Sequence, residues 1–360
     1  MKLGLPLVAL LVLVIALFLF LNRTPTAPPY APPAPESKIT LPALPAHFSG
    51  AAHAPVDEPP SPKSNVFRAY VKDDSFPKLT LEQVEPYLQA NHRNAESLLG
   101  AFMATGDRAF VREAMQKFPN DPKVAYNALY FGNLSPEESR QWADTFKRVA
   151  PDNSMAGYAS ALDYMKSGQP DLALQDMTAA GKGTWTDYSA QFMQSSEEAY
   201  RAAGYSDVDA KFAAGTQLLL PDLGQLKQLG VQINDLAKTY QQAGNTTAAQ
   251  NALQMDVQLG QQLSAIDAQP LITTLVGYAV EKIALASMDP NAPFGNTGQT
   301  VQDQINQIAQ QRQFIKSVTS QADGLVAQMS DDDVFSYFQR RQASGEIAAM
   351  QWALAKYSPQ

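Results

Sequence analysis

The fold of this chain is decided by residues 154–181, SMAGYASALDYMKSGQPDLALQDMTAAG. Small and apolar residues recur at intervals of three and four in both halves of the segment, which is the spacing of one face of an α-helix. Gly168, Gln169 and Pro170 interrupt this pattern. Glycine is favoured just after the end of a helix and proline in the first turn of the next. The segment therefore predicts two α-helices folded back on each other.

Helix-breaking glycines recur through the middle of the chain. They are Gly106, Gly132, Gly168, Gly204 and Gly244, at intervals of 26, 36, 36 and 40 residues. A period of about 34 residues is typical of helical-hairpin repeats. A hairpin can bury its apolar face only by stacking on a neighbour, so the pattern predicts an all-α solenoid. The alternative is an irregular all-α domain in which the glycine spacing arises by chance.

Two of these units resemble the tetratricopeptide repeat (TPR) closely, and a third, beginning at Asn94, resembles it less well. In the first unit the resemblance depends on Ala161, Tyr164, Gly168, Ala173, Met177 and Ala180. In the second it depends on Ile233, Leu236, Ala237, Tyr240, Gly244, Ala249 and Leu253. Asp256 stands where the family has alanine, and Gly157 and Ser160 replace its early Trp and Leu. The TPR-like region is assigned to residues 80–265, with degenerate units around Gly132 and Gly204.

The resemblance implies a concave groove, lined by the first helix of each hairpin, that binds a protein or peptide. The residues that it places in this groove are Arg93, Glu96, Met103, Met155, Tyr158, Leu162, Lys166, Asn234, Lys238 and Gln241. A groove containing arginine and lysine suits acidic ligands or a C-terminal carboxylate. The alternative is that most of these residues are ordinary solvated surface positions.

The N-terminus carries a long apolar run, Leu3 to Leu21, without a charged residue. At about 1.5 Å per residue, this run is long enough to span the roughly 30 Å hydrocarbon core of a bilayer. It exceeds the apolar region of about 7 to 15 residues in a cleaved signal peptide. We therefore predict an uncleaved single-pass anchor at residues 1–23. The two positive charges before this run, Lys2 and the terminal amine, outnumber the single one after it, Arg23. This charge difference favours a cytoplasmic N-terminus and a C-terminal body that is exported to the periplasm or the cell exterior.

Residues 24–79 form the predicted linker. Twelve of the 25 prolines of the chain fall between Thr24 and Pro62. Proline fixes φ and lacks a backbone donor, so this composition predicts an extended, semi-rigid spacer rather than a packed core. At about 3.1 Å per residue it could reach on the order of 100 Å from the membrane. The alternative is a proline-rich ligand for a groove-binding domain.

Residues 266–360 depart from the repeat pattern and predict a helical capping region. Leu271–Ser287 is apolar nearly all round and predicts a buried helix. A heptad seam follows at Val301, Ile305, Ile308, Arg312, Ile315, Thr319, Ala322, Val326 and Met329. Val318 and Leu325 widen this stripe, which favours a helix that caps the repeats. The alternative is a coiled coil at 300–329 that makes the protein a homo-oligomeric envelope spacer.

Motifs for chemistry are scarce in this chain. It has no cysteine and three histidines, of which only His92 lies outside the linker, and no P-loop, HExxH or GxSxG motif occurs. We therefore predict no catalytic residue, no metal and no cofactor. Glu96-Ser97 resembles the Glu-Ser dipeptide of lytic transglycosylases, but the Gly-Leu-Met-Gln element of that family is missing, so a cell-wall-acting enzyme is the weakest alternative. Asp331–Asp333 are explained by the dipole of a helix N-terminus rather than by a metal.

A net charge of −8 without a basic block gives no sign of nucleic-acid binding. Taken together, these patterns predict a non-enzymatic, membrane-tethered helical scaffold. We expect it to hold a protein or peptide partner at the cell envelope.

Overall fold

The computed structural model describes residues 78–265, 270–295 and 298–357. Over these residues the chain is an all-α body, as the sequence predicts, to which the structure adds one short β-hairpin. The predicted anchor at 1–23 and nearly all of the predicted linker lie outside the described residues. Among the helices that are described, none combines the length and the apolar character needed to cross a bilayer.

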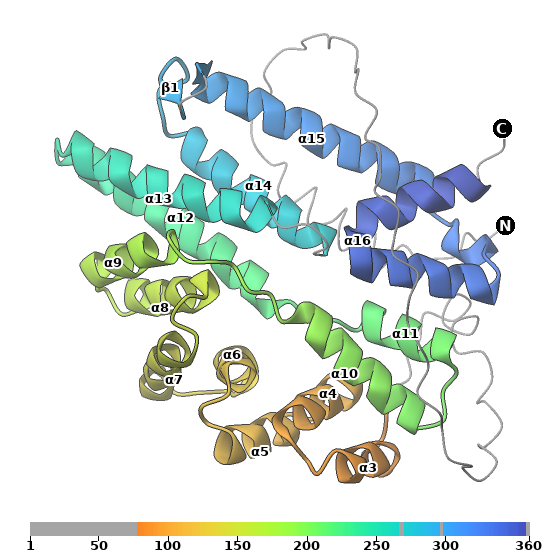
Figure 1. The fold of residues 1–360 in the computed structure, drawn as a ribbon. Helices are drawn as coiled ribbons and strands as arrows, with labels where there is room; N and C mark the ends of the chain where they lie inside the picture. The colour runs from red at the N-terminus through yellow and green to blue at the C-terminus, as the bar shows by residue number, and fades with distance from the viewer. Residues whose placement is uncertain (1–77, 266–269, 296–297, 358–360) are drawn as a thin grey trace, which may run out of the picture.

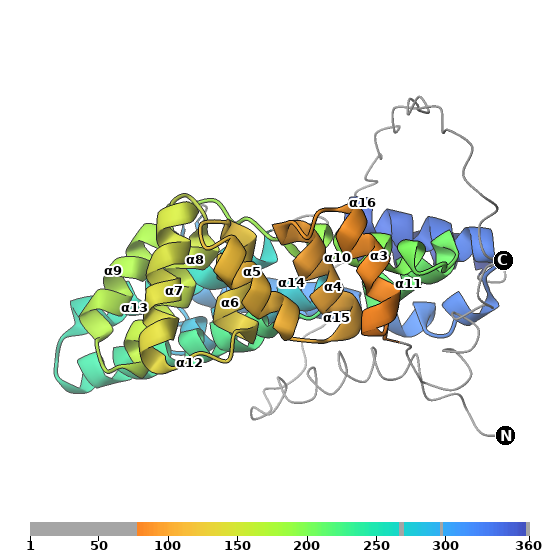
Figure 2. The same cartoon turned by 90° about the horizontal axis from the view of Figure 1, so that it is seen from below.

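The first part of the body is an arc in which helices adjacent in sequence are also adjacent in space (Figure 1). Figure 2 shows the same arc from below as one curved row. Its helices are α3 (Leu81–Ala90), α4 (Ala95–Thr105), α5 (Ala109–Lys117), α6 (Pro122–Phe131), α7 (Pro136–Val149), α8 (Ser154–Lys166) and α9 (Pro170–Ala180). Residues 154–181 therefore form the predicted helical hairpin, α8 and α9.

Glycine turns end the first helices of most hairpins. Gly106, Gly168, Gly204 and Gly244 all have positive φ, between +72° and +86°, which side chains with a Cβ rarely adopt. Gly132 differs, because its φ is −66° and the next residue, Asn133, has the positive φ of 55°. The glycine spacing thus marks five helix-to-helix turns, although at the second turn asparagine supplies the left-handed conformation.

The second layer returns across the arc instead of extending it. After α9 the chain runs through 181–187 and enters α10 (Ser189–Ala202), which packs against α3 and α4 rather than against α9. The next helices are α11 (Asp207–Thr216), α12 (Pro221–Gln242) and α13 (Thr246–Ser264). The helices are paired as in a repeat protein, but the hairpins do not all stack in sequence order.

The α12/α13 hairpin stacks directly on α8 and α9. The Tyr158 hydroxyl on α8 donates to Gln262 Oε1 on α13 at 2.8 Å. The Gln262 amide in turn donates to the Gly181 carbonyl at the end of α9, at 3.1 Å. The two TPR-like units identified in the sequence are therefore neighbours in space, although α10 and α11 lie between them in the chain.

The C-terminal helices form a third layer over α11, α12 and α13 (Figure 1). Its elements are α14 (Leu271–Leu285), strands β1 (Pro293–Phe294) and β2 (Gln299–Thr300), α15 (Val301–Ala322), the 3₁₀ turn η1 (Val326–Gln328) and α16 (Asp331–Tyr357). The two strands pair antiparallel. Within α16, Gly345 has φ 84° and ψ 168°, so the helix is broken into two parts there. Asp333 on the first part binds Lys356 Nζ on the second at 2.5 Å, and this ion pair joins them.

The predicted 300–329 helix is shorter than the heptad pattern indicates. It ends at Ala322, because Asp323 is extended with ψ 131° and Gly324 has φ +75°. Val326 and Met329 lie in and after η1. Ile308 and Ile315 are buried, and α15 packs against α14 and α16 of the same chain. The seam thus contributes to the intramolecular core.

Candidate functional site

The concave face of the arc is largely covered by the chain's own helices, because α10 packs on α4 and α12 packs on α8. This packing places five of the predicted groove residues in the interior: Met103, Met155, Tyr158, Leu162 and Asn234. The open groove implied by the TPR resemblance is therefore closed at α4 and along most of α8. The reason is non-local, since the helices that fill it come later in the chain.

The remaining predicted groove residues lie apart from one another. Arg93 forms ion pairs with Glu85 at 2.9 Å and with Glu113 at 2.6 Å, and Glu96 forms one with Lys123. Lys238 is exposed on α12 and pairs with Asp235 at 2.9 Å. Gln241 lines a separate cavity at the end of α12. These residues do not form one site, and their role in partner binding stays a prediction.

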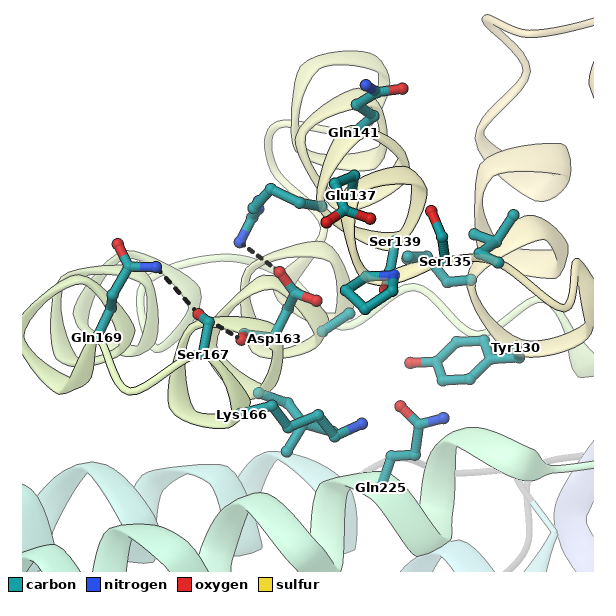
Figure 3. A pocket seen from close by; sticks show the side chains of 16 residues that line it. Tyr130, Ser135, Glu137, Ser139, Gln141, Asp163, Lys166, Ser167, Gln169 and Gln225 are labelled. Carbon is teal, nitrogen blue, oxygen red and sulfur yellow. Dashed lines mark hydrogen bonds and ion pairs between the residues drawn. The ribbon is translucent and has the colours of Figure 1, made fainter.

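Lys166 lies at an open cavity of about 720 Å³ between α6, α7, α8 and α12 (Figure 3). Apolar side chains form much of its wall: Leu129, Leu134, Pro136, Ala159 and Leu162. A volume of this size is within the range of about 300–1,000 Å³ found for ligand sites. The α6–α8/α12 pocket is thus the part of the concave side that α12 leaves uncovered.

Three polar groups converge in this pocket from three different helices (Figure 3). They are the Tyr130 hydroxyl on α6, the Lys166 ammonium on α8 and the Gln225 amide on α12. Within the ranges that the structure describes, their polar ends make no hydrogen bond or ion pair. Burial, reinforced by the charge of Asp222, raises the pKa of Tyr130 well above its usual value, so the phenol keeps its proton. All three groups can therefore donate to a ligand.

Of the other charged groups at the rim, Arg140 and Asp163 are bound to each other, whereas the Glu137 carboxylate makes no hydrogen bond or ion pair within the described residues. Arg140 donates to Asp144 at 2.7 Å and to Asp163 at 3.2 Å, and its guanidinium stacks over the Tyr164 ring at 4.1 Å. Ser135 and Glu138 form the capping box of α7. These contacts hold α7 and α8 together and leave Lys166 as the available cation of the described lining.

Two buried residues behind the pocket, Tyr126 and Asp222, hold Tyr130 in position. The Tyr126 ring lies 4.7 Å from the Tyr130 ring, and its hydroxyl donates to Asp222 Oδ1 at 2.9 Å. Asp222 is in the first turn of α12, one turn before Gln225. The hydrogen bond therefore joins α6 to α12 and sets the distance between Tyr130 and Gln225.

Substituting Asp222 by Asn is expected to raise the free energy of unfolding by about 2 kcal/mol at pH 8. Burial raises the pKa of Asp222 to about 6, partly offset by the Tyr126 hydrogen bond and reinforced by Asp187. Because this pKa is above its unfolded value, the carboxyl stabilises the fold below pH 4 and this contribution is lost as the pH rises to 6. The difference between the folded and unfolded pKa of Asp222 corresponds to a destabilisation of about 3 kcal/mol at pH 8, which the variant avoids. We subtract about 1 kcal/mol because the Asn amide accepts the Tyr126 hydrogen bond less well than the carboxylate does.

Urea unfolding of the full chain in detergent micelles, followed by circular dichroism, measures this effect. We expect the variant and the wild type to have similar stability at pH 4 and to diverge between pH 4 and 6. A pH profile that is the same for both proteins would contradict the assignment.

Of the three converging residues, sequence reasoning identified only Lys166. Tyr130 lies in the degenerate unit before Gly132, and Gln225 lies in a stretch without a repeat pattern. Ninety-five positions separate the two, and only the crossing of α12 brings them together. No periodicity in the sequence signals that crossing.

Comparison with known proteins gives no relative. No protein-family model, curated protein or solved structure matches this chain. In addition, no cluster of three or more potential metal ligands occurs in the part of the chain that the structure describes.

Proposed function

We propose that this chain is a membrane-tethered, non-enzymatic helical scaffold that binds a protein or peptide segment in the α6–α8/α12 pocket. The observation that carries the proposal is the convergence of Tyr130, Lys166 and Gln225 in a partly apolar cavity. Three uncommitted donors on rigid helices can fix the orientation of a ligand, while the apolar wall supplies contact area.

The donor set favours a partner that offers a carboxylate, either an acidic side chain or a C-terminus. Lys166 would provide the charge, and the Tyr130 hydroxyl and Gln225 amide would provide directed hydrogen bonds. Arg140 is bound to Asp144 and Asp163 and so would shape the rim rather than contact the partner.

The membrane tether in this proposal depends on the apolar run Leu3–Leu21 and on the proline-rich residues that follow. A spacer of that composition would let the folded body work at a distance from the bilayer. We place the body on the exported side of the cell membrane, because the positive charges favour a cytoplasmic N-terminus.

The proposal predicts that a photo-crosslinking amino acid at Ser139 captures a partner of defined mass in the native cells. Ser139 lines the pocket, whereas Gln116 is an exposed position on the outer helix α5 and serves as the control site. Adding Lys166→Glu should reduce the adduct at least about tenfold, because a like charge replaces the cation that receives the carboxylate. Mass spectrometry of the adduct identifies the partner.

Lys238→Glu is the matched control for the charge reversal. It changes the same residue type on the exposed, distant part of α12, where Lys238 pairs with Asp235. The adduct should persist in this variant. The proposed function fails if Ser139 gives no discrete adduct, or if Gln116 gives the same one.

A further inference from the structure

A second cavity of about 300 Å³ lies at the far end of α12 and α13, next to the β-hairpin. Figure 1 shows this end of the molecule, where β1 lies near the tips of the two helices. Its lining residues are distinct from those of the α6–α8/α12 pocket. Gln241 is the one residue of the sequence-predicted groove that reaches it.

One wall of this cavity consists of uncharged amides. Gln250 and Gln254 are one turn apart on α13, and Gln241 lines the cavity from α12. All three residues are exposed. Within the described chain, the side chains of these three residues form no hydrogen bond. Each amide presents a donor and an acceptor close together, which matches a hydroxyl group that both donates and accepts.

Apolar residues also line the cavity. Phe294 and Pro293 come from β1, and Leu253 forms part of the floor. Leu253 is fully buried, whereas Phe294 is half-buried and keeps part of its ring accessible. The negative face of an aromatic ring attracts the weakly positive C–H bonds of a ligand.

The charge of the lining narrows the ligand class. No cation lines the described cavity, and its one carboxylate, Asp289, accepts a backbone hydrogen bond from Asn291 at 2.9 Å. An anionic ligand would thus meet a negative charge and no compensating positive one. A purely apolar ligand would desolvate three amides without replacing their hydrogen bonds.

We propose that this cavity, the α12/α13-end site, binds a neutral saccharide. A pyranose ring has hydroxyls at its edge for the amides of Gln241, Gln250 and Gln254, and an apolar C–H face for Phe294. The volume is at the lower end of the usual range for ligand sites, so it accommodates one ring while the rest of a chain extends into solvent.

Saturation-transfer NMR with the full chain in detergent micelles tests this proposal. The probes are three neutral tetrasaccharides: cellotetraose, tetra-N-acetylchitotetraose and maltotetraose. We expect at least one to bind saturably in the millimolar range, with the strongest transfer to the axial ring protons that would contact Phe294. Gln250→Ala and Gln254→Ala should each weaken that binding about fivefold, the usual effect of losing one hydrogen bond.

Gln242→Ala is the matched control, because Gln242 is an exposed amide beside Gln241 that does not line the cavity. It should leave the affinity unchanged, and circular dichroism should show that all three variants keep the helical fold. The proposal is overturned if none of the three tetrasaccharides binds saturably, or if Gln254→Ala binds as tightly as Gln242→Ala.

Discussion

Replacing Asp256 by alanine is expected to stabilise the protein by about 3 kcal/mol at pH 8. Asp256 is fully buried on α13, and both of its carboxylate oxygens lack a hydrogen-bond partner within the described residues. A buried charge without compensation typically costs about 3 to 5 kcal/mol, which exceeds the small packing loss caused by truncation. Alanine is also what the TPR pattern has at this position.

The stabilisation caused by Asp256→Ala should increase as the pH rises. Burial raises the pKa of Asp256 well above its ordinary value. The folded state therefore holds the proton more tightly than the unfolded chain does, and wild-type stability falls as the pH rises above about 4. The slope from this one group approaches about 1.4 kcal/mol per pH unit until its folded pKa is passed. The difference between variant and wild type should thus be small at pH 4 and large at pH 8.

Denaturant unfolding of the full chain at pH 4, 6 and 8 provides this measurement. Asp235→Ala is the control, because Asp235 is exposed on α12 with Lys238 as its only ion-pair partner in the described chain. That variant should stay within about 0.5 kcal/mol of the wild type. If Asp256→Ala instead unfolds more easily at pH 8, the Asp256 carboxylate must have a stabilising partner.

The features that were predictable from the sequence are those determined by neighbouring residues. Gly168 and Pro170 end α8 and begin α9 as expected, because turn conformation and helix capping depend on local backbone geometry. The heptad seam shows the limit of this reasoning. The apolar spacing continues to Met329, but Gly324 adopts a left-handed conformation and the helix has already ended at Ala322.

The stacking order of the hairpins was not predictable, because it depends on contacts between distant segments. Helix α10 lies against α4 at a point where a Cβ on Gly100 would come within 2.8 Å of the Ser195 carbonyl oxygen. In the sequence, Gly100 is only a glycine inside a helical pattern. The same return of the chain buries Met103 and leaves the α6–α8/α12 pocket open. Of the three converging polar residues in this pocket, only Lys166 could therefore be predicted from the sequence.

Gly260→Ala is expected to destabilise the protein by about 3 kcal/mol or more. A Cβ on Gly260 would lie 2.6 Å from the Glu281 backbone nitrogen and 2.8 Å from the Gly277 carbonyl oxygen. Both atoms belong to the backbone of α14, so the clash can be relieved only by moving α14 away from α13. Alanine has the higher helix propensity by about 1 kcal/mol, and the steric cost must exceed this gain.

Gly224→Ala tests whether the effect comes from the close helix contact and not from the substitution itself. Gly224 is also inside a helix, α12, but a Cβ there would meet no atom within 4 Å. The same change should therefore stabilise the protein by up to about 1 kcal/mol. Opposite signs for the two variants in urea unfolding would show that glycine at 260 is required by the α13–α14 contact. That contact joins α14 to the α12/α13 hairpin, so a neutral Gly260→Ala would mean that α14 is held mainly by its contacts with α12 and α15.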